Sequence, residues 1–227
     1  MIDHLIWDSA FFGFPVGKIL IENPFDFHED EFKSAANSFR LVYVFSGKPI
    51  IGASFARLVD VKLTFQKALN ASTTSKKLIF FDKKIHDKKA LLQLAWESGS
   101  YSRFKTDLHF DRKDYFRMYE IWVNKSLTSE QSFVMIEAVN NELLGFVTVD
   151  LNDSESASIG LIAVDESCRG QGVGSNLMKQ AECLAVQYGR KFLKVATQQE
   201  NVLAAAFYNK KGYKVANQEY IYHFWNL

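Results

Sequence analysis

The segment that most constrains the fold of this chain is 164–174, which reads V-D-E-S-C-R-G-Q-G-V-G. An apolar strand pattern runs into an arginine and three alternating glycines, and a helix-forming stretch follows at once. Glycines at 170, 172 and 174 let the backbone turn sharply and approach a ligand with no Cβ in the way. A helix that opens at about Gly172 directs its free N–H groups at that ligand. The segment therefore predicts a phosphate-binding loop between a strand and a helix.

The spacing of the glycines separates the candidate ligands. A dinucleotide-binding fold needs G-x-G-x-x-G near the start of a βαβ unit and an acidic residue about twenty positions later. This chain instead has G-x-G-x-G late in the sequence, after Arg169. The run R-x-x-G-x-G and the strand before it resemble the coenzyme A loop of the GCN5-related N-acetyltransferase (GNAT) superfamily. A glycine-rich turn without a ligand is the alternative that the pattern alone leaves open.

The resemblance implies acetyl-coenzyme A as the cofactor. In that superfamily, backbone amides of the loop hold the pyrophosphate, and the preceding strand offers its backbone to the pantetheine arm. Cofactor contacts are therefore implied at Leu161, Ile162, Ala163, Val164, Arg169, Gly170, Gln171, Gly172, Val173, Gly174 and Ser175.

The order of expected elements over 81–227 also resembles this superfamily. Helices are predicted from the cap Asp87 and from about Asp114, with a loop at 99–111 between them. There follow three antiparallel strands at 133–139, 143–150 and 157–164, the glycines, a helix ending near Gly189, a strand at 192–197, a helix at 204–210, and strands at 213–215 and 220–225. The resemblance implies an α/β (α+β) GNAT fold, whose mixed, mostly antiparallel sheet has a V-shaped splay between strands 157–164 and 192–197.

Residues 1–80 have a different pattern. Strand-like runs at 16–21, 41–45 and 78–81 and an amphipathic segment around 29–39 predict a small N-terminal α/β subdomain, to which the subgroup resemblance described below assigns a contribution to the acceptor site. The stretch 70–77 is the most linker-like, so we expect two domains, 1–80 and 81–227.

The helix at 204–210 and the residues before it carry a candidate catalytic group. Acetyl transfer from a thioester to an amine needs an acid for the leaving thiolate. Asn201 and Tyr208 are seven positions apart, so on a helix they lie on nearly one face. N-x-x-A-x-x-x-Y, followed by Gly212, resembles the last motif of the superfamily, which implies a cofactor contact for Asn201 and protonation of the departing coenzyme A by Tyr208. Taken alone, such a tyrosine is more often a core ring.

Several segments resemble one subgroup more closely, the dTDP-fucosamine acetyltransferase family, which acetylates the 4-amino group of a nucleotide-linked dideoxy sugar. They are Phe11-Phe12-Gly13, Ser102-Arg103-Phe104, Val195-Ala196-Thr197-Gln198 and the Asn201 to Tyr208 motif. The resemblance implies that Phe11, Phe12, Ser102, Arg103 and Phe104 face this acceptor, with Arg103 on a phosphate. An exposed loop charge is the alternative for Arg103.

Composition and charge argue against other classes. Acids and bases are interspersed with a net charge of +1, which predicts neither a nucleic-acid nor a membrane partner. Two cysteines and five histidines lack C-x-x-C and H-E-x-x-H spacing, so no disulfide framework and no metal site are expected. With no leader pattern and no apolar run of about 18 residues, a cytoplasmic protein is expected.

Nothing in the spacing singles out a general base. His109 with Asp111 is interpreted as a solvated surface pair, and Cys168 lacks a histidine partner in the sequence. Direct attack by the amine, without a covalent acetyl-enzyme, is therefore the hypothesis. Two other functions stay open: acetylation of another amine, such as a protein N-terminus or a polyamine, and non-catalytic binding of acyl-coenzyme A. A C-terminal hairpin with exposed edge strands would allow a homodimer.

Overall fold

The structure is a computed structural model that describes residues 1–52, 54–70, 77–151 and 153–226. By its internal contacts the chain divides into two compact units. The first unit comprises Met1–Leu63, Gln198–Glu200 and Asn217–Leu227, and the second comprises Thr64–Thr197 and Asn201–Ala216. The predicted domain boundary after residue 80 stays a prediction, and most of the predicted linker at 70–77 lies outside the described residues.

The first unit is a small α/β structure. Its elements are β1 (Asp3–His4), α1 (Ile6–Phe12), β2 (Val16–Ile21), a 3-10 turn (Pro24–Asp26), α2 (Glu29–Ala36), β3 (Leu41–Ser46) and parts of β4 (Arg57–Ala68) and β9 (Lys214–Trp225). β2 and β3 are parallel, and β9 runs antiparallel to β3. Phe32 of α2 belongs to one buried cluster with Val42, Val44 and Tyr222, which forms the core of this unit. The predicted strands at 16–21 and 41–45 are confirmed, and the predicted helix at 29–39 is shorter.

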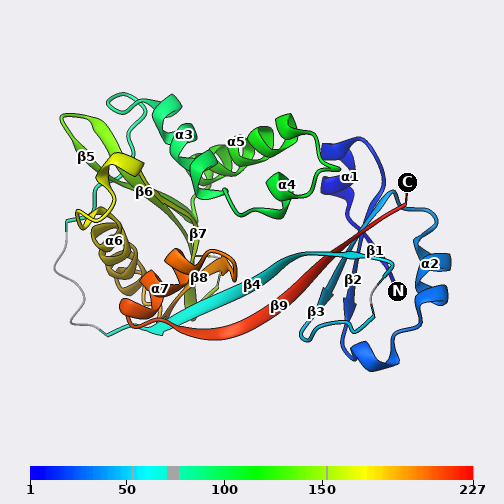
Figure 1. Cartoon of the computed structure of the whole chain (residues 1–227). Coiled ribbons are helices and arrows are strands. Elements are labelled where there is room, and N and C mark those ends of the chain that lie inside the picture. Colours follow the sequence, from blue (N-terminus) through cyan, green and yellow to red (C-terminus); the bar gives the residue numbers. More distant parts are fainter. Residues whose placement is uncertain (53, 71–76, 152, 227) are drawn as a thin grey trace. The chain divides into compact units, whose positions relative to one another are not determined.

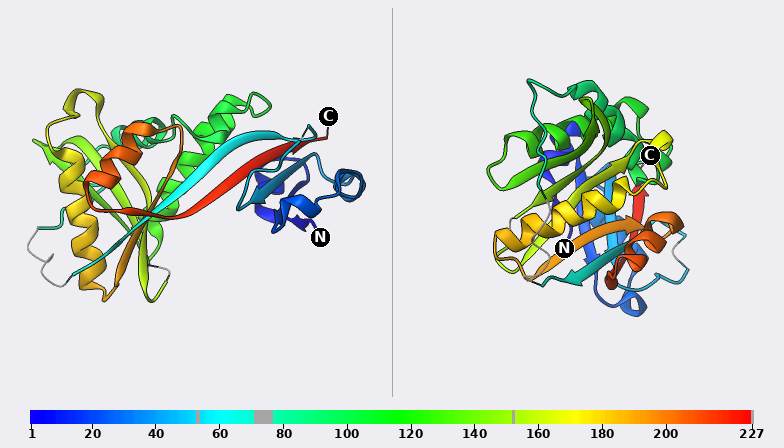
Figure 2. Two further views of the ribbon diagram at one scale, coloured as in Figure 1. Left: turned by 60° about the horizontal axis from the view of Figure 1, so that its bottom comes forward. Right: turned by 90° about the vertical axis from the view of Figure 1, so that its left-hand side faces the viewer.

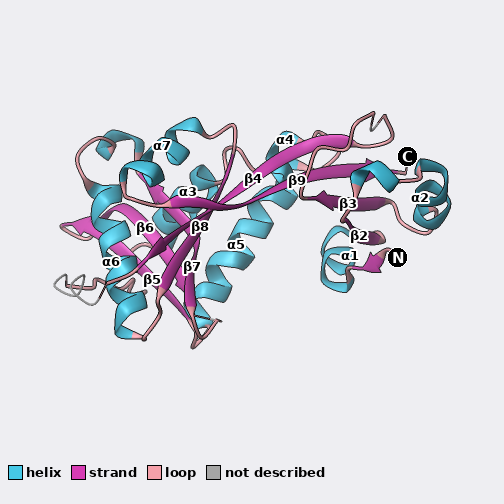
Figure 3. Ribbon diagram, turned by 90° about the horizontal axis from the view of Figure 1, so that it is seen from below, coloured by secondary structure: helices cyan, strands magenta, loops and turns pink. Residues whose placement is uncertain are grey.

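The second unit carries the glycine-rich segment (Figure 1). Its remaining elements are α3 (Lys88–Ser98), α4 (Arg103–Thr106), α5 (Arg112–Thr128), β5 (Ser132–Val139), β6 (Glu142–Asp150), β7 (Ser156–Val164), a 3-10 turn (Glu166–Cys168), α6 (Val173–Gln187), β8 (Phe192–Gln198) and α7 (Val202–Lys210). β5, β6 and β7 are antiparallel and β8 is parallel to β7, so the predicted mixed, mostly antiparallel sheet is confirmed. The helix α6 covers one face of these strands, and α3 and α5 cover the other (Figure 3).

The predicted splay lies between β7 and β8. Their paired residues run from Ser156 with Phe192 to Ile159 with Val195. β7 continues to Val164 and β8 to Gln198 without further pairing, so the two strands separate beyond Ile159. The backbone of β7 that precedes the glycines is thereby left open on the β8 side.

Three predicted elements differ from the structure. The expected strand at 78–81 is reduced to an isolated bridge between Phe80 and Met135. Residues 99–111, expected as a loop, contain the helix α4, which Ser102 caps. The expected strands at 213–215 and 220–225 are one continuous strand, β9, with β3 and β4 as its neighbours (Figure 2). No C-terminal hairpin forms in the described chain, so it cannot supply the edge strands on which the expected homodimer rested.

None of the described helices has the length and apolar character needed to cross a membrane.

Candidate active site

The glycine loop, residues 169–174, has the backbone geometry expected of an anion site. Gly170 and Gly172 have φ angles of 78° and 89°, the left-handed region that glycine adopts at low cost. Gly172 is the N-cap of α6, and no side chain caps the N–H groups of the first turn. A Cβ on either glycine would meet nothing within 4 Å, so the conformation, and not close packing, favours glycine here. The uncapped amides and the helix dipole suit a phosphate group.

Side-chain hydrogen bonds fix the conformation of the residues that lead into the glycine loop. Asp165 accepts a hydrogen bond from Ser167 N at 2.9 Å, and the Ser167 hydroxyl donates to the same carboxylate, which lowers the pKa of Asp165. Gln171 Nε2 donates to Ser167 O at 3.0 Å. Arg169 folds back, because its Nε donates to Val164 O at 3.2 Å and its Nη2 lies 3.8 Å from Glu97 Oε2. The loop is therefore pre-formed by the chain's own contacts.

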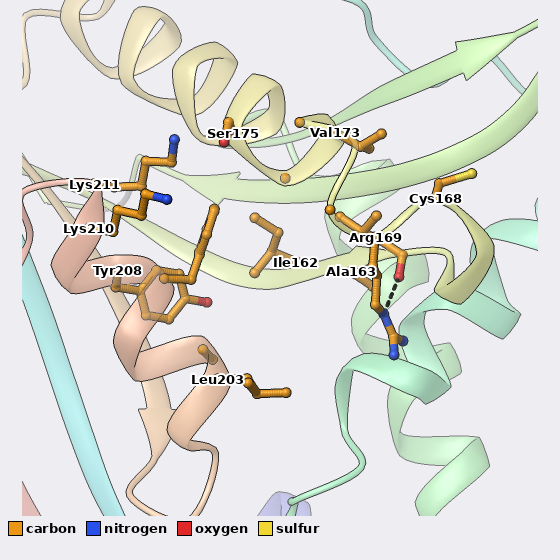
Figure 4. Close-up of a pocket in the computed structure, with 16 residues that line it drawn as sticks. Ile162, Ala163, Cys168, Arg169, Val173, Ser175, Leu203, Tyr208, Lys210 and Lys211 are labelled. Carbon is orange, nitrogen blue, oxygen red and sulfur yellow. Dashed lines mark hydrogen bonds between the residues drawn. The ribbon is translucent and has the colours of Figure 1, made fainter.

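A cavity of about 510 Å³, here called the Tyr208 cavity, lies between β7, the glycine loop and α7 (Figure 4). It brings together these predicted site residues: Ile162, Ala163, Val164, Arg169, Gly170, Gly172, Val173, Gly174, Ser175 and Tyr208. The hydroxyl of Tyr208 points into it from α7. Leu161 and Gln171, also predicted, do not line it.

Burial keeps Tyr208 in its neutral, protonated form. Its side chain is 4% exposed and packs on the rings of Phe65 and Tyr213, at centroid distances of 5.6 and 6.3 Å. This burial raises the pKa of Tyr208 above the usual value, because the phenolate would lose its hydration. At neutral pH the group is a protonated donor at the wall of the cavity.

The sequence reasoning missed several lining residues: Leu203, Ala204, Phe207, Lys210 and Lys211. The spacing contains a signal for most of them. Leu203, Phe207 and Lys211 recur every four residues, as do Ala204 and Tyr208, which places both sets toward one side of α7. Cys168, considered and rejected as a nucleophile, also lines the cavity.

A second cavity of about 400 Å³, here called the Glu97 cavity, adjoins the first. It shares five lining residues with the Tyr208 cavity: Ile162, Ala163, Val164, Arg169 and Leu203. Glu97, Ser100, Tyr101 and Asn201 line the rest of it, together with Ser98. Asn201 Oδ1 accepts from Ala204 N at 3.2 Å and so caps α7. A cofactor contact for Asn201 stays a prediction.

The predicted acceptor residues of the loop 99–111 have structural roles. Ser102 accepts from Phe104 N at 3.4 Å as the N-cap of α4, and Phe104 is buried against Phe110 and Trp122. The Arg103 guanidinium lies 4.5 Å from the centroid of the Phe104 ring. Contact of these three residues with an acceptor stays a prediction.

Phe11 and Phe12 lie in α1 of the first unit. Phe11 stacks on Trp7 with a centroid distance of 5.1 Å and meets Phe12 edge-on at 4.8 Å. Both rings are half-buried. Their predicted contact with the acceptor also stays a prediction.

The pairing expected for His109 is wrong. Its Nδ1 lies 2.9 Å from Oδ1 of Asp107, a carboxylate that is 2% exposed, and not next to Asp111. Asp111 instead caps α5 through Lys113 N at 2.9 Å and forms an ion pair with the Lys113 side chain. Across the residues that the structure describes, no three His, Cys, Asp or Glu side chains are grouped as a metal site would need.

Comparisons with known proteins agree with this geometry. The sequence model of the acetyltransferase (GNAT) family matches residues 89–213, more than half of the chain. The chain is 24% identical to the spore coat polysaccharide biosynthesis protein SpsD of Bacillus subtilis, over 61% of this chain and 48% of that protein. It is 29% identical to the dTDP-fucosamine acetyltransferase of Escherichia coli O6:H1, over 58% of this chain and 56% of that protein. These matches span about half the length of each relative.

Solved structures show the same fold. A GCN5-related N-acetyltransferase from Kribbella flavida superposes with a TM-score of 0.56 at 9% identity, over 92% of this chain and 81% of that one. At this identity the likeness concerns the fold alone.

Proposed function

This chain belongs to the acetyltransferase (GNAT) family, an N-acetyltransferase family that uses acetyl-coenzyme A, and we propose that its acceptor is the amino group of a dTDP-4-amino-dideoxy sugar used in cell-surface polysaccharide synthesis. We further propose that the acetyl group passes directly to the amine, with Tyr208 as the general acid. The observation that carries the proposal is the buried, protonated Tyr208 hydroxyl, which points into the cavity that the glycine loop lines.

The residues of the Tyr208 cavity fit the cofactor. Two left-handed glycines and the uncapped start of α6 suit a pyrophosphate, and the end of β7, which pairs with β6 but not with β8, offers Ile162, Ala163 and Val164 to an extended pantetheine arm. When bound, acetyl-coenzyme A supplies an acetyl group activated as a thioester.

The chain's own groups then have distinct roles. Residues 170–174 hold and orient the donor, and Tyr208 Oη gives its proton to the departing sulfur. The amine nitrogen of the acceptor forms the new amide bond as the thioester C–S bond breaks, and the proton that this nitrogen loses returns Tyr208 to the phenol, so no side chain carries the acetyl group. Much of the rate enhancement comes from holding the thioester and the amine close together in adjoining cavities.

Two relatives support the choice of acceptor. One is named as a dTDP-fucosamine acetyltransferase and the other as a spore coat polysaccharide biosynthesis protein, and both names fit modification of a sugar that enters a surface polymer. Arg103 adds a cation, which suits a phosphorylated nucleotide better than a cationic polyamine.

The first experiment measures release of free thiol from acetyl-coenzyme A by the purified chain. Release that requires a dTDP-4-amino-dideoxy sugar supports the proposal, whereas release with a polyamine or a peptide N-terminus alone refutes this acceptor. If titration shows binding of acetyl-coenzyme A but no acceptor gives release, the chain is a binding module and not the enzyme proposed here.

Tyr208→Phe tests the acid. Its kcat should fall by about 10²- to 10⁴-fold while the Kd of acetyl-coenzyme A is kept, because only proton donation is lost. Tyr188→Phe, at an exposed tyrosine outside both cavities, is the matched control. A Tyr208→Phe variant with the kcat of the parent would refute the assignment.

Cys168→Ala tests direct transfer. Cys168 lines the cavity, so a covalent route through its thiol is the competing chemistry. We expect the variant to keep its turnover, and the parent to show no added acetyl mass after incubation with acetyl-coenzyme A alone. An acetylated Cys168 peptide with loss of turnover in the variant would contradict direct transfer.

A further inference from the structure

We propose that the groove between α3 and α5 binds the nucleoside diphosphate part of the acceptor, an inference that rests on the function proposed above. The groove has a volume of about 470 Å³ and lies within the second unit. Trp96, Glu97 and Ser100 line it from α3 and the turn that follows, Lys105 from α4, and Arg112 and Phe116 from α5. Its volume lies within the range of about 300–1,000 Å³ that small-molecule sites occupy.

The charge of the groove favours an anion. Lys105 and Arg112 are exposed, and within the described ranges neither forms an ion pair. The nearby carboxylates are engaged elsewhere: Asp111 pairs with Lys113 at 2.9 Å, and Glu97 lies 3.8 Å from Arg169. Two uncompensated cations at the rim of one groove suit a diphosphate, which presents two adjacent charged groups.

The walls of the groove favour a flat ring next to that anion. The indole of Trp96 meets the Phe116 ring edge-on, with a centroid distance of 5.1 Å, and its N–H donates to Phe116 O at 3.2 Å. The Arg112 guanidinium lies 5.7 Å from the Phe116 ring centroid, and the Lys105 ammonium lies 5.7 Å from that of Tyr115. Aromatic faces beside cations are the combination that binds a nucleobase with its phosphates.

The groove also communicates with the catalytic residues. It shares Glu97 and Ser100 with the Glu97 cavity, which in turn shares Ile162, Arg169 and Leu203 with the Tyr208 cavity. A ligand that begins in the groove therefore lies beside residues that also line the Glu97 cavity, and its other end would be directed toward the Tyr208 cavity. A molecule with a nucleotide at one end and an amine at the other has the required shape.

The adenosine phosphates of coenzyme A share this chemistry, so the test separates the two sources. Titration calorimetry compares dTDP and acetyl-coenzyme A on the parent and on the double variant Lys105→Ala, Arg112→Ala. We expect the Kd of dTDP to rise by about tenfold or more, since each charge-assisted contact contributes strongly, and the Kd of acetyl-coenzyme A to stay unchanged. Lys125→Ala removes an exposed cation of α5 that does not line the groove and should leave both values unchanged.

An unchanged Kd for dTDP in the double variant, no binding of dTDP to the parent, or a loss confined to acetyl-coenzyme A would each overturn the inference. Retained affinity for acetyl-coenzyme A shows that the variant is folded. The proposed function is tested separately, by turnover of the amino sugar. If the double variant turns over the amino sugar with an unchanged KM, the assignment of the groove is overturned but the proposed function stands. If dTDP binding depends on the two cations but the amino sugar is not turned over, the assignment of the groove is supported and the proposed acceptor is refuted.

Discussion

The backbone N–H of Leu161 donates a hydrogen bond to Oγ1 of Thr148 at 2.8 Å, across the point where the register between β6 and β7 shifts. A bulge of this kind turns a strand and redirects the residues after it. The residues that follow are 162–164, which line both the Tyr208 cavity and the Glu97 cavity. Gly160 is needed beside the bulge, because a Cβ there would lie 2.9 Å from Thr148 Oγ1. The Thr148 hydroxyl therefore helps to determine how β7 enters the site.

Replacing Thr148 should damage both stability and cofactor binding. Thr148→Val leaves the Leu161 N–H without its acceptor in a part-buried place, which costs about 1–3 kcal/mol of unfolding free energy. We expect the KM for acetyl-coenzyme A to rise as the end of β7 shifts. Urea unfolding and steady-state kinetics measure the two effects. Thr148→Ser keeps the hydroxyl and serves as the control, and equal behaviour of both variants would contradict a role for the hydrogen bond.

The glycine loop predicts opposite effects for two neighbouring glycines. Gly172→Ala forces a side chain into a left-handed conformation and should cost about 1–2 kcal/mol of stability while weakening acetyl-coenzyme A binding. Gly174→Ala places a Cβ in ordinary contact, 3.4 Å from the Phe207 ring, and should leave the unfolding free energy unchanged or raise it by up to about 1 kcal/mol. Thermal unfolding compares the two, and equal losses would show that φ is not the cause.

A buried ion pair in the second unit should matter more than an exposed one. Glu182 is 5% exposed, and its Oε1 lies 2.7 Å from Lys67 Nζ and accepts from Tyr213 OH at 3.0 Å. Glu182→Ala should lower the unfolding free energy by about 1–3 kcal/mol, because Lys67 and Tyr213 both lose their hydrogen-bond acceptor. The loss is moderated because Lys67 is partly exposed and regains some hydration.

The matched control is the exposed pair of Lys191 and Glu155, 3.1 Å apart. Glu155→Ala should cost less than about 1 kcal/mol. Denaturant titration measures the unfolding free energy of both variants. If Glu155→Ala lowers it as much as Glu182→Ala does, the expected difference between the buried and the exposed pair is refuted.

Buried tyrosines predict loss of stability at high pH. Burial raises the pKa of Tyr115, Tyr208 and Tyr213 above the usual value of about 10. A raised pKa in the folded state contributes stability that is complete below about pH 10 and is lost as the pH rises through the folded values. Unfolding free energies measured on both sides of pH 10 should therefore fall steeply, and less so in Tyr208→Phe. A flat profile would contradict the burial effect.

The same shift constrains the pH dependence of turnover. Because Tyr208 stays protonated, its ionisation should produce no basic limb in the kcat profile below about pH 10. A limb below that pH that disappears in Tyr208→Phe would show a lower pKa than burial implies.

Local signals predicted most of the second unit. Asp87 caps α3 as expected, and the glycine spacing placed the start of α6 within one residue. The missing parts depend on distant partners. Ile79 N donates to Gln180 Oε1 at 2.8 Å, and Ile79 O and Phe81 N form hydrogen bonds with the backbone of β5, so the segment expected as a strand at 78–81 is held by distant partners that no local pattern reveals. The two expected C-terminal strands form one strand, β9, which lies between β4 and β3 in the sheet, with β3 paired to residues 220–225.

By itself, the sequence determined the elements whose formation depends on neighbouring residues. Left-handed glycines, helix caps and the spacing of Asn201 and Tyr208 act over a few residues, so they can be identified along the chain. Tertiary structure alone decided that Gln180 of α6 binds the backbone of Ile79, and that the groove lined by Lys105 and Arg112 adjoins the Glu97 cavity. These relations depend on which surfaces pack together after folding, because burial and charge pairing act between residues far apart in sequence.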